Sequence, residues 1–339
     1  MQIRWAVTFG ILLSLFFIPT TAMAHIPIGG GGDSLETATE VVNPQNSWVA
    51  YTELYEGAEP QYFKASYSTG ERIDIRLAIP MELVDTDFRP ILVIMGPGLT
   101  NQSTPPGYLE IPIGAGVMVF DSEPEFAEYE GFTPSSFYLV ADVDFPSPQT
   151  GIYYFAIFEP DSGERYSIVF GHIEAYTLWD WISIPLITIL VHTWDGQDYF
   201  EIFAPYVAAF MIGLGLLLYR KPSLRTDVKP LNLIGIIGSL MIGATSFSII
   251  QNTIIALLGA PINVLIVVTI FVILNSLIGS FIATRILVRE NLSRKDSAKL
   301  IIIAIFAFAL WAGYIIGPTL LSLVGLISLA TKLRSARIE

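Results

Sequence analysis

Hydrophobic and polar positions alternate along the first half of the chain and give way to long hydrophobic runs in the second half. Between residues 47 and 171, short stretches place an apolar side chain at every second position, as Ile73, Ile75 and Leu77 do around the polar Asp74 and Arg76. A period of two is typical of half-buried β-strands. We therefore expect a β-rich part followed by a helical part.

Eight stretches with this alternation are separated by turn-forming clusters such as Gly96-Pro97-Gly98 and Pro146-Ser147-Pro148. The predicted strands are 48–53, 61–66, 71–79, 91–95, 116–120, 137–142, 151–158 and 165–171. No helical period lies between them. Residues 25–175 are therefore expected to form an all-β sandwich or jelly roll.

The hydrophobic runs of residues 199–339 are long enough to cross a bilayer. They predict an α-helical membrane domain with about four transmembrane helices, at 200–219, 231–258, 261–286 and 299–326. The last uncharged run, 300–331, has 32 residues with Gly317-Pro318 in its middle. A single kinked helix is favoured there, because few residues follow the proline; a hairpin that returns the tail to the other side is the alternative.

The first 24 residues have the parts of a secretory signal peptide: Arg4, the apolar stretch 9–18, and Ala22-Met23-Ala24 as a cleavage site. An uncleaved anchor helix is the alternative.

A second short apolar segment precedes the membrane domain. Residues 176–198 contain an uncharged stretch too short to span, with Trp179, Trp181 and Trp194 as membrane-interface residues. We predict an interfacial amphipathic helix and linker there, the alternative being a strand or plug within the sandwich.

Charge divides the chain at the same place. Residues 25–198 contain 26 Asp and Glu against 5 Lys and Arg, whereas residues 199–339 contain 5 against 12. The basic loops 220–229 and 285–299 are expected in the cytoplasm, which places the N-terminal domain of this multi-pass plasma-membrane protein outside. An acidic domain repels phosphates, so nucleic acid is excluded as a partner and the lipid bilayer is expected as one.

Part of the β-rich half is similar to a known family. Segments 34–39, 58–64, 70–75, 149–157 and 166–169 carry the likeness, the fourth reading Gln-Thr-Gly-Ile-Tyr-Tyr-Phe-Ala-Ile. Together, over about residues 33–172, they resemble the bacterial pre-peptidase C-terminal domain, a small jelly-roll module of secreted proteins. The resemblance implies binding or display rather than catalysis. The Asp-x-Asp-like acidic turn usual in that family is replaced here by Glu56-Gly57-Ala58-Glu59.

Two metals are candidate cofactors. Cleavage after residue 24 makes His25 the N-terminus, where its amine and ring resemble the histidine brace of copper proteins, and His172 is a third nitrogen donor. Exposed or hydrogen-bonded histidines are the alternative. The acidic segment 121–130 is interpreted as a solvated loop, with calcium as the alternative. The chain has no cysteine, which excludes disulfides and thiolate chemistry.

Small residues recur at four-residue spacing in the predicted spans and allow close helix packing, within one chain or between copies. These helix-packing residues are Gly235, Ser239, Gly243, Ser276, Ser280, Gly313 and Gly317. The middle of the spans carries no ionisable side chain, which disfavours a transporter and excludes catalytic residues there.

Three functions follow from these features. The first is a cell-envelope membrane protein whose acidic sandwich binds or displays an extracellular ligand. The second is an accessory or structural subunit of a larger membrane complex, including a copper-binding one. A transporter is the third and least favoured, and no enzymatic activity is assigned.

Overall fold

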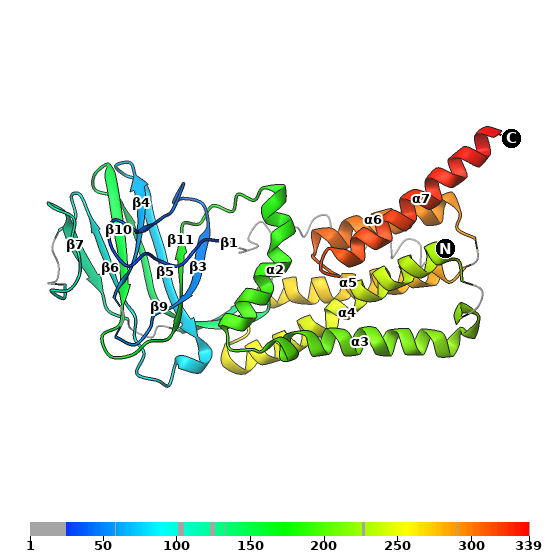
Figure 1. Cartoon of the computed structure of the whole chain (residues 1–339), viewed down its shortest axis with the longest axis horizontal. Helices are drawn as coiled ribbons and strands as arrows, with labels where there is room; N and C mark the ends of the chain where they lie inside the picture. The colour runs from blue at the N-terminus through cyan, green and yellow to red at the C-terminus, as the bar shows by residue number, and fades with distance from the viewer. Residues whose placement is uncertain are drawn as a thin grey trace.

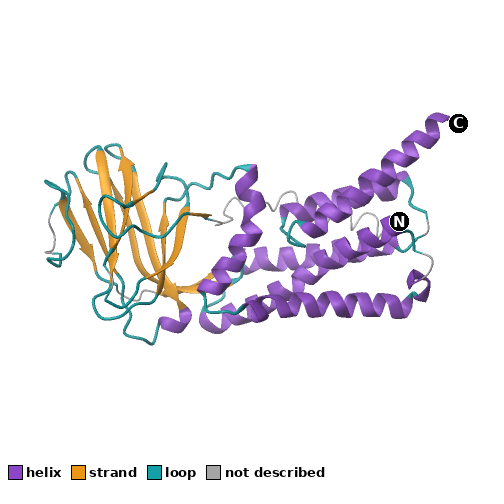
Figure 2. Ribbon diagram, in the orientation of Figure 1, coloured by secondary structure: helices purple, strands orange, loops and turns teal. Residues whose placement is uncertain are grey.

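The structure, a computed structural model, describes residues 25–57, 59–100, 105–122, 126–131, 133–225, 228–289 and 291–338. Figure 1 shows a β-sandwich at one end of an elongated molecule, a helical bundle at the other, and helix α2 (Leu178–Trp194) running across the junction between them. Figure 2 shows that strands and helices are separated in the same way. The predicted fold class is confirmed; the proposed signal peptide, residues 1–24, lies outside the described residues.

The sandwich consists of two sheets. The six-stranded sheet has the order β1-β3-β11-β5-β9-β8 and the five-stranded sheet the order β2-β4-β10-β6-β7. Successive long strands cross from one sheet to the other, as in a jelly roll. The strands are β1 Ile26–Pro27, β2 Thr39–Glu40, β3 Trp48–Glu53, β4 Gln61–Tyr67, β5 Arg72–Pro80, β6 Ile91–Gly96, β7 Gly116–Phe120, β8 Phe126–Glu130, β9 Ser135–Pro146, β10 Gly151–Phe158 and β11 Arg165–Phe170.

All eight predicted strands are present, as β3 to β7 and β9 to β11. The alternating apolar residues of β5, among them Ile73, Ile75 and Leu77, are fully buried between the sheets. The segment 121–130, in contrast, is not only a loop. Its second half is strand β8, which pairs antiparallel with β9. In this strand Tyr129 buries its ring on one face, while Glu128 and Glu130 lie on the other face.

Six α-helices follow: α2, α3 Tyr199–Arg220, α4 Pro230–Gly259, α5 Ile266–Leu287, α6 Arg294–Ala309 and α7 Ile316–Ile338. Short 3-10 turns lie at Met81–Leu83 and Pro222–Arg225. Three helices begin with a capping box, in which Thr177, Asp198 or Ser293 bonds the backbone three residues on. Helices α3, α4, α5 and α7 are long and apolar enough to cross a membrane, so the chain is a membrane protein.

The expected single helix 299–326 is wrong, since α6 and α7 form an antiparallel hairpin. Residues Trp311, Gly313, Tyr314 and Ile315 between them have positive φ angles of 51°, 85°, 49° and 66°, which no right-handed helix accepts. The Thr245 hydroxyl of α4 accepts a hydrogen bond of 2.7 Å from the Gly313 N–H and fixes the turn. Near the far end, Arg294 donates to the Lys332 carbonyl at 3.1 Å.

The small residues of α4 lie against neighbouring helices of the same chain. A Cβ atom on Gly243 would lie 2.5 Å from the Ser280 hydroxyl oxygen of α5, and the Ser239 and Thr284 hydroxyls are 2.8 Å apart. A Cβ atom on Gly317 of α7 would lie 3.0 Å from the Gly238 carbonyl oxygen. Close backbone approach therefore joins α4 to both α5 and α7 within one chain.

Gly243→Val tests this packing. We expect the free energy of unfolding to fall by about 1–3 kcal/mol, because the added methyl groups force α4 away from α5. The matched control is Gly215→Val on α3, where nothing lies within 4 Å of an added Cβ. Thermal unfolding of the two purified variants should differ by several degrees; equal midpoints would show that the α4–α5 contact is loose.

Candidate functional site

A groove lies between the outer face of the six-stranded sheet and helix α2. Apolar residues of α2 form one wall, among them Ile184, Ile187 and Val191. The opposite wall is more polar and includes Tyr51, Arg76, Glu128, Glu130, Ser135, Ser167 and, at the N-terminal strand, His25. The free cavity is only about 60 Å³, well below the roughly 300 Å³ of a small ligand site. In this conformation the groove is a packed interface with room for water.

The groove is electrostatically mixed. Burial raises the pKa of Glu128, with Asp142 adding to the rise and Arg76 opposing it. Burial, assisted by Arg76, lowers the pKa of His25 to about 3, so its ring is neutral at physiological pH. Arg76 is thus the cation that faces the groove carboxylates.

The C-terminal end of α2 is attached to the sandwich. Trp194 is only 7% exposed, and its indole N–H donates to the Tyr166 carbonyl at 3.0 Å. Arg165 donates to the Trp194 carbonyl at 2.7 Å and pairs with Glu82, so a cation neutralises the negative end of the helix dipole. Trp194 was expected at the lipid interface; it is instead buried against β3 and β11, because the sheet supplies an acceptor for its N–H.

The N-terminal half of α2 is attached to the helical bundle. Trp181 packs on Trp311 of the α6–α7 turn with ring centres 4.5 Å apart, and the Trp311 indole donates to the Trp181 carbonyl at 3.0 Å. Trp179 is 74% exposed and shares the outer face of α2 with Leu186 and Leu190. Of the three predicted interface tryptophans, only Trp179 thus presents its ring to the surroundings.

A separate contact joins the sheet edge to the α4–α5 connection. The Tyr129 hydroxyl lies 2.7 Å from the Thr269 hydroxyl, which donates to the Gly131 carbonyl at 2.6 Å. Asn263 donates to the Tyr129 carbonyl at 2.8 Å, and Tyr129 is 0% exposed. Sequence reasoning missed these residues, because a lone Tyr in an acidic strand and a lone Asn in a helix connection carry no pattern.

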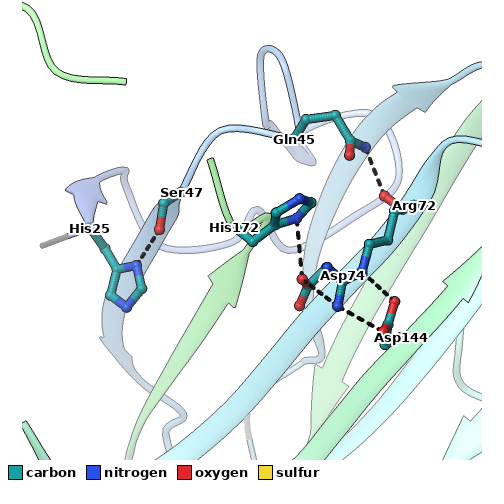
Figure 3. Close-up of polar contacts among 7 residues, drawn as sticks. All are labelled: His25, Gln45, Ser47, Arg72, Asp74, Asp144 and His172. Atoms are coloured by element: carbon teal, nitrogen blue, oxygen red, sulfur yellow. Dashed lines mark hydrogen bonds and ion pairs between the residues drawn. The ribbon is translucent and has the colours of Figure 1, made fainter. Parts of the chain in front are cut away.

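The structure does not bring His25 and His172 together. Figure 3 shows the His25 ring directed at Ser47, while His172 lies 3.3 Å from Asp74 in a cluster with Arg72 and Asp144. Strand β3 pairs with β1 on one side and β11 on the other, so the two histidines lie roughly 10 Å apart in the sheet. The first and last predicted strands, β3 and β11, do pair antiparallel, but His25 precedes β1, on the side of β3 opposite to β11 and His172. Among the described residues, no three His, Cys, Asp or Glu side chains form a group that could hold a metal ion.

Comparisons with known proteins give no family. No family model matches the chain, and no curated protein matches it. One solved structure, CorA, described as a surface-associated copper-binding protein important in Methylomicrobium album BG8 copper acquisition, aligns over its whole length with 44% of this chain, at 10% identity and a TM-score of 0.22. Another, named pT26-6p, aligns over 50% of its length with 80% of this chain, at 7% identity and a TM-score of 0.13. Neither likeness is close enough to indicate function.

Asp195, directly after α2, makes the attachment of this helix sensitive to pH. Burial raises the pKa of Asp195 to about 7, and Arg165 opposes the rise. Because the unfolded value is about 4, the folded chain binds the extra proton between about pH 4 and 7 and loses stability as pH rises through that window. Asp195→Asn should therefore raise the thermal midpoint by roughly 2–4 °C at pH 8 and by clearly less at pH 5, where only the first part of that loss has occurred.

The control is Asp161→Asn, which changes the same group on an exposed turn. Thermal scans of both variants at the two pH values give the comparison. An equal gain for Asp195→Asn at pH 5 and pH 8 would show that the carboxylate is not strained by burial.

Proposed function

We propose that this chain is a cell-envelope membrane protein that holds an acidic β-sandwich outside the cytoplasm, at a fixed orientation, for binding or display. One observation carries the proposal: the cations of the helical part lie at the end of the bundle opposite the sandwich. They belong to helix ends and loops that meet there, and those whose side chains the structure describes are Arg220, Lys221, Lys229, Arg285, Arg289, Arg294, Lys295, Lys299, Lys332 and Arg334. Cationic loops are retained in the cytoplasm.

Local contacts support this arrangement. Lys229 before α4 donates to Asn291 before α6 at 2.9 Å, and Asn232 donates to the Arg289 carbonyl after α5 at 3.0 Å. The loops before α4 and between α5 and α6 are therefore adjacent. Because the α6–α7 hairpin returns the chain, the basic tail ends beside them, and all basic segments share one side of the membrane.

The way the sandwich is attached supports binding or display. Its sheet edge bonds the α4–α5 connection through Tyr129 and Asn263. Its Arg165 bonds the C-terminal end of α2, and α2 in turn bonds the bundle through Trp181 and Trp311. The domain is therefore oriented and not freely tethered. Both cavities at this junction are small, which favours a partner recognised on the outer surface of the sandwich over a small ligand bound beneath it. The resemblance to the pre-peptidase C-terminal domain points the same way and stays a proposal.

Helix α2 is proposed to lie in the outer membrane interface. It crosses the bundle axis in Figure 1, and its outer face exposes Trp179, Leu186 and Leu190. Trp is favoured at that depth, where its ring meets both lipid and water.

A subunit role in a larger membrane complex is the second candidate. Helix α3 supports a subunit role, because only 6% of its most apolar stretch is buried within the chain. This helix packs mainly on α4, so the rest of its surface is free to meet another chain. Lipid alone would also cover such a helix. Copurification of other membrane chains in mild detergent distinguishes the two.

Cysteine labelling tests the orientation without background, since the chain has no native cysteine. Single variants Asp161→Cys in the sandwich, Lys221→Cys after α3 and Lys332→Cys near the end of α7 place the thiol at exposed positions. A membrane-impermeant maleimide added to intact cells should label Asp161→Cys fully and the other two only after permeabilisation.

Each deviation has a distinct meaning. Labelling of Lys221→Cys from outside would contradict the orientation and with it the proposed function. Labelling of Lys332→Cys from outside, with Lys221→Cys still protected, would instead mean that α6 and α7 do not return the tail to the cytoplasm. A permeabilised sample of each variant controls for buried thiols.

A further inference from the structure

A second cavity lies inside the junction, between α2, α4 and the α6–α7 turn. His192 of α2, Ser248 and Asn252 of α4 and Tyr314 of the turn line it, beside apolar side chains that include Pro185 and Trp311. His192 is 2% exposed and Asn252 is 6% exposed. Trp311 and Tyr314, which both line the cavity, have left-handed backbone conformations. Backbone strain of that kind concentrates at functional sites.

Two of these buried polar side chains, His192 and Asn252, leave hydrogen-bonding capacity unused. The Asn252 Nδ2 atom lies 2.8 Å from His192 Nε2, whereas His192 Nδ1 and Asn252 Oδ1 have no partner. If the amide donates to Nε2, the free atoms are an Nδ1–H donor and an Oδ1 acceptor. If the amide is flipped, the free atoms are an Nδ1 acceptor and an amide donor. In either arrangement one donor and one acceptor remain free, and buried groups of this kind normally have a partner.

The cavity selects by charge. The described residues that line it include no Lys, Arg, Asp or Glu. Burial lowers the pKa of His192 to about 4, so the imidazole is neutral at physiological pH. An ion would lose its hydration here without gaining a counter-charge, whereas a neutral molecule would not meet that cost.

Size limits the occupant further. The cavity holds about 50 Å³, and one water needs roughly 10–15 Å³ on this measure. That is space for about four heavy atoms. We infer that the cavity is a binding site for a small neutral solute that donates and accepts hydrogen bonds, a short amide or alcohol, with His192 and Asn252 as its recognition pair.

Acetamide and acetate test the inference as a matched pair, because they have the same shape and differ in charge and in hydrogen-bond donors. Saturation-transfer NMR on the purified full chain suits the weak affinity expected of so small a ligand, roughly in the millimolar range. Acetamide should receive saturation in a titratable manner, and acetate at the same concentration should not. Equal transfer to both, or transfer to neither, overturns the inference.

Variants locate the site. Asn252→Leu removes half of the recognition pair and should weaken acetamide binding about tenfold. The control, Asn275→Leu, makes the same substitution on α5, where the amide donates to the Phe271 carbonyl of its own helix, and should bind as the unaltered chain does. If Asn252→Leu does not fold, Ser248→Ala, which deletes one lining hydroxyl, should still weaken binding. Unchanged affinity in the folded variant contradicts the site.

Discussion

Helix α2 is held at its two ends by hydrogen bonds from tryptophan indoles to backbone carbonyls, and the arrangement of the whole molecule depends on this. Trp194 donates to Tyr166 of the sandwich, and Trp311 of the bundle donates to Trp181. Each indole is largely buried, where an unpaired N–H would cost about 1–3 kcal/mol. The helix is thus fixed between the sandwich and the bundle, which also meet directly where β8 and β9 lie against α4 and α5. Its position creates both the groove beneath the sheet and the polar cavity above the bundle.

The second constraint is the separation of charge. Carboxylates dominate the sandwich and cations the far end of the bundle, with long uncharged helices between them. The α6–α7 hairpin matters here, because one continuous final helix would carry Lys332 and Arg334 to the sandwich end. The left-handed turn at 311–315, fixed by Thr245 and by the contact of Trp311 with α2, therefore links the local geometry of the chain to its proposed orientation.

Local patterns were enough to predict the elements but not their partners. Alternation located β3 to β7 and β9 to β11, since each strand buries one face, and the uncharged runs located α3, α4 and α5. Strand β8 was not predicted, because Tyr129 is buried by contacts with Thr269 and Asn263, which lie 140 and 134 residues further along the chain. The hairpin was only the alternative to a single helix, because its turn needs positive φ angles at non-glycine residues, stabilised by contacts from α2 and α4. The pairing of β3 with β11 was foreseen, but not strand β1, which places His25 on the side of β3 opposite to His172. In each case a long-range contact decided the outcome, and no sequence period reports one.

The central claim is that the sandwich is fixed on the end of the bundle, and a disulfide trap measures this directly. A Cβ atom on Gly259 at the end of α4 would lie 3.3 Å from the Ser136 hydroxyl oxygen of β9, close to the about 3 Å that separates a Cβ from its partner's sulfur in a disulfide. In the Gly259→Cys/Ser136→Cys variant of this cysteine-free chain, we expect mild oxidation in native membranes to form the bridge nearly completely. Ser136→Cys with Gly215→Cys on α3 should stay reduced. Free, alkylatable thiols in the first pair after oxidation would show that the sandwich is not fixed there and would contradict the claim.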